Sequence, residues 1–160
     1  MNRPILIFSL IYVILLGIVE AKGVYARGLS VSPPSCQWRD VQVGELVEFP
    51  GRIKIKNRSR EVRSYTLRVV NPSELGANTA EGFKELPSQA WISFDQKQLP
   101  VGPEEWKDVR MFIEIPEREG NFDKKWAFFV EVKEDIGRGE TFGLACYIKV
   151  LLATESKPPR

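Results

Sequence analysis

Apolar and polar residues alternate along much of the chain after residue 27, with the period of two that is typical of a half-buried β-strand. Each alternating set places apolar side chains on one face and polar side chains on the other. These sets lie at 29–32, 46–56, 65–70, 109–115, 126–132 and 144–152. Proline or glycine interrupts or follows most of them, which indicates strands joined by short turns.

Shorter apolar stretches at 41–43 and 91–94 are further strand candidates, and Gly137-Arg138-Gly139 predicts a hairpin turn. The longest irregular segment is 71–90, where only a short helical turn at 81–86 is expected. Seven or eight short strands without crossover helices predict an all-β sandwich of two antiparallel sheets, each burying one face. The last strand is apolar on both faces. This pattern fits a strand that other parts of the protein cover on both faces, and it also fits a strand that lies at an edge and pairs with a partner.

The N-terminal segment has a different pattern. Arg3 precedes an apolar run from residue 5 to residue 19, and small-residue sites end at Ala21 and Ala26. This layout predicts a signal peptide at 1–26, cleaved after Ala21 or Ala26. The alternative is a retained membrane anchor, although the run is shorter than the about 20 apolar residues that span a bilayer. The sandwich then occupies 27–153, and a flexible tail is expected at 154–160.

Composition narrows the function. The 160 residues include no histidine, and 23 basic against 21 acidic residues give a net charge of only +2. The missing histidine excludes Ser-His-Asp and Cys-His hydrolysis and the usual zinc sites, so neither enzymatic activity nor a cofactor is expected. The small net charge predicts no nucleic-acid partner.

Cys36 and Cys146 are the only cysteines in the chain. In an exported protein, two cysteines predict one disulfide bond, which here would close a long loop and stabilise the fold by about 4–5 kcal/mol. The alternative is two separate buried thiols.

A basic series is the first candidate binding surface. Arg52, Lys54 and Lys56 alternate with apolar residues and therefore share one face of a strand, with Arg58 beyond its end and Arg68 on a neighbouring strand. Such a face can attract anionic polymers or head groups, or it can simply be a solvated outer face.

Three apolar or aromatic residues complete the candidate sites. Trp106 follows Glu104-Glu105 at the start of a strand, and we expect it to be the most exposed of the tryptophans. Trp126 is instead in phase with the core positions of its strand. An exposed indole can stack on a sugar ring, although tryptophan more often packs in a core or rim. Tyr147 and Leu151 lie on the second apolar face of the last strand and are candidates for partner contact by strand addition. Asn57-Arg58-Ser59 fits a glycosylation sequon but is better interpreted as a turn.

The order of these segments carries a family resemblance, which covers nearly all of the chain after residue 27. The segments are Ser32-Pro33-Pro34, Val43-Gly44-Glu45, residues 53–59, residues 65–70, Trp91-Ile92, residues 99–102 and residues 113–116. This order resembles the immunoglobulin-like peptidoglycan-binding domain of WxL-interacting proteins and, more distantly, pilus-chaperone and major-sperm-protein domains. The resemblance implies an immunoglobulin-like sandwich. Most of the shared motifs are turn residues, so they indicate the fold more than the function.

Together these observations predict an exported, non-enzymatic binding module of the periplasm or cell surface. Its partner would be a cell-wall polymer or an envelope protein, and it would contact a membrane only if the N-terminal segment is retained. The alternative is a periplasmic assembly factor or a surface-appendage subunit that pairs with its partner by strand addition.

Overall fold

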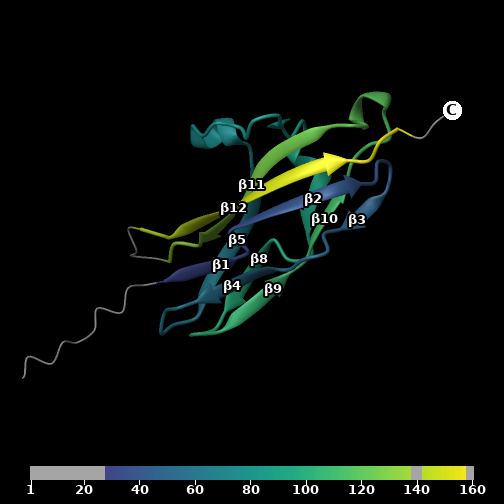
Figure 1. Cartoon of the computed structure of the whole chain (residues 1–160). Helices are drawn as coiled ribbons and strands as arrows, with labels where there is room; N and C mark the ends of the chain where they lie inside the picture. Colours follow the sequence, from purple (N-terminus) through teal and green to yellow (C-terminus); the bar gives the residue numbers. More distant parts are fainter. Residues whose placement is uncertain (1–27, 138–141, 158–160) are drawn as a thin grey trace, which may run out of the picture.

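Two β-layers pack face to face in the computed structural model, which describes residues 28–137 and 142–157 (Figure 1). The predicted signal peptide at 1–26 and most of the hairpin turn at Gly137-Arg138-Gly139 lie outside the described residues. The strands are β1 (Leu29–Ser32), β2 (Ser35–Val41), β3 (Leu46–Glu48), β4 (Ile53–Asn57), β5 (Arg63–Val70), β6 (Lys84–Glu85), β7 (Ile92–Phe94), β8 (Gln98–Val101), β9 (Trp106–Val109), β10 (Met111–Glu114), β11 (Lys125–Glu134) and β12 (Ala145–Thr154). Short 3₁₀ turns occur at Pro72–Leu75, Gln89–Trp91 and Glu119–Asn121.

The first layer has the strand order β2-β12-β11-β5-β8, and β6 pairs with the start of β11. The pairs β12–β11, β11–β5 and β5–β8 are antiparallel, as the sequence predicts. The β2–β12 pair is parallel, because β2 enters this layer from the other one instead of returning through a hairpin.

The second layer consists of β1-β4-β9 and, in continuation, β3-β10-β7. Pro50-Gly51 separates β3 from β4, at the bend that the sequence suggests. A Cβ atom on Gly51 would lie 2.6 Å from the Phe49 ring, so the bend requires glycine here. The Phe49 N–H donates to the Met111 carbonyl at 2.8 Å and continues the β3–β10 pairing up to the bend.

The chain changes layer at both sides of the sandwich. At one side, β1 pairs with β4 and, after Pro33-Pro34, β2 pairs with β12 in the opposite layer. At the other side, β7 pairs with β10 and, after residues 95–97, β8 pairs with β5 in the opposite layer. Each edge position is therefore shared between two short strands, and neither β2 nor β8 follows its neighbour along its full length.

The core lies between the layers and is formed by the parities that the sequence predicts. The side chains of Phe128, Val130 and Val132 in β11 are fully buried. Ile148 and Val150 of β12 are at most 1% exposed. These clean parities are why an all-β, immunoglobulin-like sandwich could be expected from the sequence.

The tryptophans divide as expected. Trp126 is 4% exposed and meets the half-buried Trp91 edge to face, with ring centroids 5.3 Å apart, whereas Trp106 is 49% exposed. The aromatic core pair thus belongs to the fold, and only Trp106 presents a large indole surface to solvent.

The 71–90 segment contains no helical turn at 81–86, contrary to expectation, because residues 84–85 form strand β6 beside β11. A 3₁₀ turn forms instead at Pro72–Leu75, where proline occupies the first position and Glu74 accepts a bond from the Asn71 N–H at 2.8 Å. Glu85 then accepts bonds from the N–H and hydroxyl of Ser73 at 2.6 and 2.9 Å, which ties the two ends of the segment together.

Residues 154–157, which the sequence places in a flexible tail, are tied to the sandwich. The Glu155 N–H donates to the Val41 carbonyl at 3.0 Å, and the Glu155 carboxylate accepts from the Val43 N–H at 2.9 Å. Ser156 donates to Asp123 at 2.7 Å.

Candidate functional site

The start of β12 presents an open strand edge. β11 pairs with β12 from Lys133↔Ala145 to Lys125↔Ala153, but β2 joins the other side only from Lys149 onward. Among residues 28–137 and 142–157, no strand pairs with residues 145–148 on the side away from β11. We refer to residues 145–148 as the open edge.

The hydrogen-bond pattern shows which backbone groups face this edge. Successive residues of an antiparallel strand direct their N–H and C=O groups alternately toward and away from the partner. The Glu134 N–H donates to the Leu144 carbonyl at 2.8 Å, so even-numbered residues face β11. The Lys149 N–H donates to Pro34 on the other side at 3.2 Å, so odd-numbered residues face away from β11. Ala145 and Tyr147 therefore direct their N–H and C=O groups toward the open edge.

Large apolar side chains are exposed around the open edge and on the hairpin segments that lead to it. Phe142 is 82% exposed, Ile136 51%, Tyr147 40% and Leu144 39%. All four belong to the ends of β11 and β12 or to the segments that join them. Unpaired backbone groups next to exposed apolar side chains are the combination that a strand-adding partner requires.

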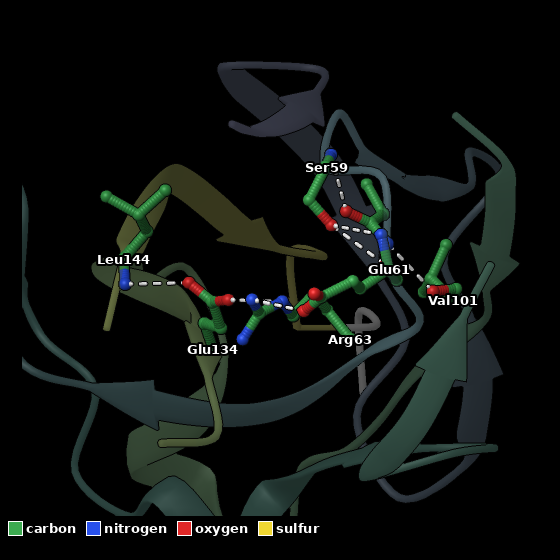
Figure 2. Close-up of polar contacts among 7 residues, drawn as sticks. Ser59, Glu61, Arg63, Val101, Glu134 and Leu144 are labelled. Atoms are coloured by element: carbon green, nitrogen blue, oxygen red, sulfur yellow. Dashed lines mark hydrogen bonds and ion pairs between the residues drawn. The ribbon is translucent and has the colours of Figure 1, made fainter. Parts of the chain in front are cut away.

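A polar network inside the mouth of the sandwich holds the hairpin base in place (Figure 2). Leu144 N–H donates to the Glu134 carboxylate at 3.2 Å, and the same carboxylate lies 3.4 Å from Arg63 Nε. Arg63 Nη2 in turn donates to the Glu61 carboxylate at 3.0 Å. Glu134 is only 4% exposed, so its charge is buried and requires these partners.

The β4–β5 turn anchors the far end of this network. Asn57 is fully buried, and its amide donates to the carbonyls of Glu61 at 2.7 Å and Val101 at 2.9 Å. The Ser59 N–H donates back to Asn57 Oδ1 at 2.8 Å. Asn57-Arg58-Ser59 is thus a structural turn, as expected. The neighbouring Tyr65 is 1% exposed, and burial together with the Glu134 carboxylate raises its pKa to about 12.

A second polar cluster supports the open edge from the outer face of the same sheet. Glu131 of β11 lies directly opposite Arg68 of β5 on one side and Tyr147 of β12 on the other. Arg68 binds the Glu131 carboxylate through Nε and Nη2, and the Tyr147 hydroxyl donates to it at 2.9 Å. The bond from Arg68 lowers the pKa of Glu131, and the bond to Glu131 raises the pKa of Tyr147. The Tyr147 side chain is therefore fixed by a buried ionised carboxylate.

The structure separates the candidate residues that the sequence singled out. Tyr147 and Arg68 lie together in the cluster just described. Leu151 is on the same face but sits where β2 already pairs with β12, opposite Gln37, so it is not on the open edge. A partner strand beside Tyr147 would end before it reaches Leu151.

The remaining candidates lie on the opposite layer. Lys54 and Lys56 share the outer face of β4, and Trp106 of β9 is directly opposite Lys56. Lys56 Nζ lies 5.9 Å from the Trp106 ring centroid and 3.1 Å from the Glu104 carboxylate. This arrangement explains why Trp106 stays exposed at the edge of a charged face.

Acidic partners divide the predicted basic face. Arg52 pairs with Glu48 at 2.6 Å, and Asp108 lies directly opposite Lys54 on β9. Arg58 is on the β4–β5 turn, with its N–H donating to the Gly28 carbonyl at 2.7 Å. Basic and acidic side chains are therefore interspersed, and Arg68 is on the other sheet.

The predicted Cys36–Cys146 disulfide bond is absent, and both residues are free thiols. Cys36 is paired with Val150, four residues along β12 from Cys146. Four residues span about 13 Å of strand, which exceeds the about 7 Å that a bridge allows between Cα atoms. The disulfide prediction was wrong because the register of β2 on β12, which separates the two thiols, has no signal in the local sequence. Burial raises the pKa of Cys36 to about 11 and also raises the pKa of Cys146.

Sequence reasoning missed Glu131 and Glu134, the two carboxylates that organise the site. Both interrupt or end the apolar run of β11, and both are 4% exposed. In 28–137 and 142–157, no group of three or more His, Cys, Asp or Glu side chains is placed to hold a metal ion. Within the same residues, no helix has the length and apolar character to cross a membrane.

The two layers and the strands shared between them define an immunoglobulin-like β-sandwich. Neither known protein families nor curated protein sequences give a match to this chain. Solved structures do. The ASH/PapD-like domain 7 of human CEP192 is similar with a TM-score of 0.56 at 9% identity, covering 81% of this chain and 87% of that one.

Bacterial chaperones are similar to the same extent. The periplasmic chaperone SfaE has a TM-score of 0.54 at 14% identity, with 82% of this chain and 61% of that chain covered. The SafB chaperone structure, solved with the Salmonella enterica SafA pilin, gives 0.55 at 8% identity, with 80% and 55% covered. The chain thus spans somewhat more than half the length of these chaperone chains. At such low identities, the similarity shows the fold alone.

Proposed function

We propose that this protein is an exported, non-enzymatic assembly factor that binds a partner protein by strand addition to the open edge of β12. The observation that carries the proposal is that the N–H and C=O groups of Ala145 and Tyr147 pair with no strand in the described part of the chain. β1 lies nearby, where its Leu29 carbonyl accepts from the Cys146 thiol at 3.8 Å, but β1 pairs with β4 of the other layer. A partner strand would continue the sheet at the position that β2 occupies farther along β12. The predicted signal peptide at 1–26 supports export.

Two further observations support this function over other uses of the same fold. The exposed side chains of Ile136, Phe142 and Leu144 offer apolar contacts beside the edge, and such contacts add specificity to backbone pairing. Several structurally similar proteins are chaperones, and one of them was solved with a pilin. The partner proposed for this chain is a protein with a free strand.

Site-specific photo-crosslinking tests the proposal. A benzoylphenylalanine at position 145 should capture a partner from envelope extracts of the source cells, and one at exposed Lys107 of β9 should not. Ala145→Pro should abolish capture by a crosslinker placed at Phe142, because proline removes the edge N–H. Ala145→Ser keeps that N–H and should retain capture. Equal capture by the proline and serine variants would contradict strand addition.

A second candidate function is recognition of a cell-wall polymer by the β1-β4-β9 face. The favouring observation is the exposed indole of Trp106 beside Lys56. Acidic neighbours of Arg52, Lys54 and Lys56 weaken the attraction of this face for anionic polymers. Co-sedimentation with purified cell wall, compared between the native protein and Trp106→Ala, distinguishes this function from strand addition.

A further inference from the structure

A second place where strand edges are open lies at the opposite side of the sandwich. β8 pairs with β5 over residues 63–66, and the Leu67 N–H donates to the Lys97 carbonyl at 2.8 Å. Beyond this point the chain has crossed to the other layer, and a cavity of about 400 Å³ lies between β5 and β7. We refer to it as the β5–β7 groove. Its lining consists of Leu67, Arg68, Val69, Gln89, Ala90, Ile92, Ser93, Phe94 and Lys97.

Backbone groups face this groove from both layers. The Leu67–Lys97 bond shows that odd-numbered residues of β5 face away from β11, so Val69 directs its N–H and C=O groups beyond the end of β8. The Asp95 N–H donates to the Arg110 carbonyl at 3.1 Å, so the backbone groups of odd-numbered residues in and just after β7 face β10. Phe94 therefore directs its N–H and C=O groups away from β10. In the described part of the chain, no strand pairs with these backbone groups of Val69 or Phe94.

The spacing of the layers suits an extended chain. Sheets in a sandwich lie about 10 Å apart and paired strands about 4.8 Å apart, so one strand between the two edges comes within hydrogen-bonding distance of both. Side chains of such a strand would alternate between the half-buried Phe94 and the solvent-facing rim.

The charge of the groove indicates which polypeptide it suits. Its lining contains no carboxylate and two cations, Lys97 and Arg68, of which Arg68 is already paired with Glu131, although basic and acidic residues are nearly equal in the whole chain. The nearby carboxylate of Asp95 is occupied by Arg110, which donates from its N–H at 2.9 Å and from Nε at 3.0 Å. None of the ion pairs among the described residues includes Lys97, so its charge is available to a ligand.

We propose that the β5–β7 groove binds an extended acidic segment of a partner polypeptide, which adds to β5 in line with β8. This site is separate from the open edge of β12, because the two lie on different strands and at opposite sides of the first layer. The Arg68–Glu131–Tyr147 cluster spans the sheet between them. One molecule can therefore hold two extended segments at once, one at each open edge.

Titration of the full-length protein with a defined peptide, followed by amide NMR shifts, tests this inference. The probe is a short acetylated peptide in which valine and glutamate alternate, and the matched control peptide replaces glutamate with lysine. The acidic probe should shift the amides of Val69, Phe94 and Lys97, and the basic peptide should not. Shifts confined to Ala145 and Tyr147, or no saturable shifts at all, would overturn the proposal.

Variants on the exposed rim sharpen the test without disturbing the core. Lys97→Glu should weaken binding of the acidic probe about fivefold to tenfold by charge repulsion, whereas Lys54→Glu on the opposite layer should leave it unchanged. Ala90→Trp places an indole in the groove and should abolish binding. Unchanged affinity in both Lys97→Glu and Ala90→Trp would show that the groove is not the site, and it would leave the crosslinking result at position 145 unaffected.

Discussion

The two halves of β12 share one neighbour and differ in the other. Both pair with β11, but only residues 149–154 are also covered by β2, while residues 145–148 are open. Core side chains such as Ile148 and Val150 are equally buried in both halves. The difference is therefore confined to backbone groups and outer-face side chains, and a strand can be a fully stable part of a core while one of its edges remains available.

The largest expected effect compares proline in the two halves. Lys149→Pro removes the donor of the bond to Pro34 and places its ring against that carbonyl, so the free energy of unfolding should fall by about 2–3 kcal/mol. Ala145→Pro removes an N–H that no described strand accepts, and the change should stay within about 1 kcal/mol. Urea denaturation followed by tryptophan fluorescence measures both, with Lys149→Ala as the side-chain control. Equal losses would mean that the two halves do not differ.

An intermediate effect concerns the carboxylate that fixes Tyr147 beside the open edge. Glu131→Gln replaces a buried charged acceptor, so the free energy of unfolding at pH 7 should fall by about 1–2 kcal/mol. Because folding lowers the pKa of Glu131, its contribution is fully present above the unfolded pKa of about 4.3 and is lost as pH falls through the folded pKa.

Urea midpoints measured from pH 7 to pH 3 check this prediction. The native protein and Glu131→Gln should differ most at neutral pH and converge at acidic pH. Exposed Glu114 on β10 provides a control position, because Glu114→Gln should give a constant small difference. A difference for Glu131→Gln that grows on acidification would have the wrong sign for this cluster.

The smallest effect is a difference in thiol reactivity. Cys36 lies in β2, the strand that covers the second half of β12, and burial raises its pKa to about 11. Cys146 belongs to the open half, and burial also raises its pKa. Iodoacetamide at pH 8 should therefore modify Cys146 first, and both thiols only after unfolding. Mass spectrometry of the alkylated protein, with and without reductant, checks this prediction. If alkylation occurred only after reduction, the two cysteines would form a disulfide bond after all.

The fold was predictable because its signal is local. Phe128, Val130 and Val132 alternate with outer-face residues along one strand, and such alternation fixes which side meets the core without knowledge of the partner strand. The pairing of strands distant in sequence carries no such signal. The register that sets Cys36 opposite Val150, and the break that stops β2 short of Tyr147, appear only when the strands are assembled.

The candidate site was predictable only in part for the same reason. Tyr147 could be selected because it adds a second apolar face to the last strand. Glu131 and Glu134 gave a weaker signal, namely charges at positions of a strand that is otherwise buried. Their partners Arg68 and Arg63 come from β5, more than sixty residues earlier, and only the β11–β5 register brings them together.

The buried turn at Asn57 has a practical consequence for producing this protein. A sequon that enters a eukaryotic secretory pathway meets the glycosylating enzyme while the chain is still unfolded. A glycan attached to Asn57 at that stage would occupy the amide that must bond Glu61 and Val101 inside the fold. Expression in bacteria avoids this modification, and a secreted eukaryotic product should contain Asn57 only in its unglycosylated form among correctly folded molecules.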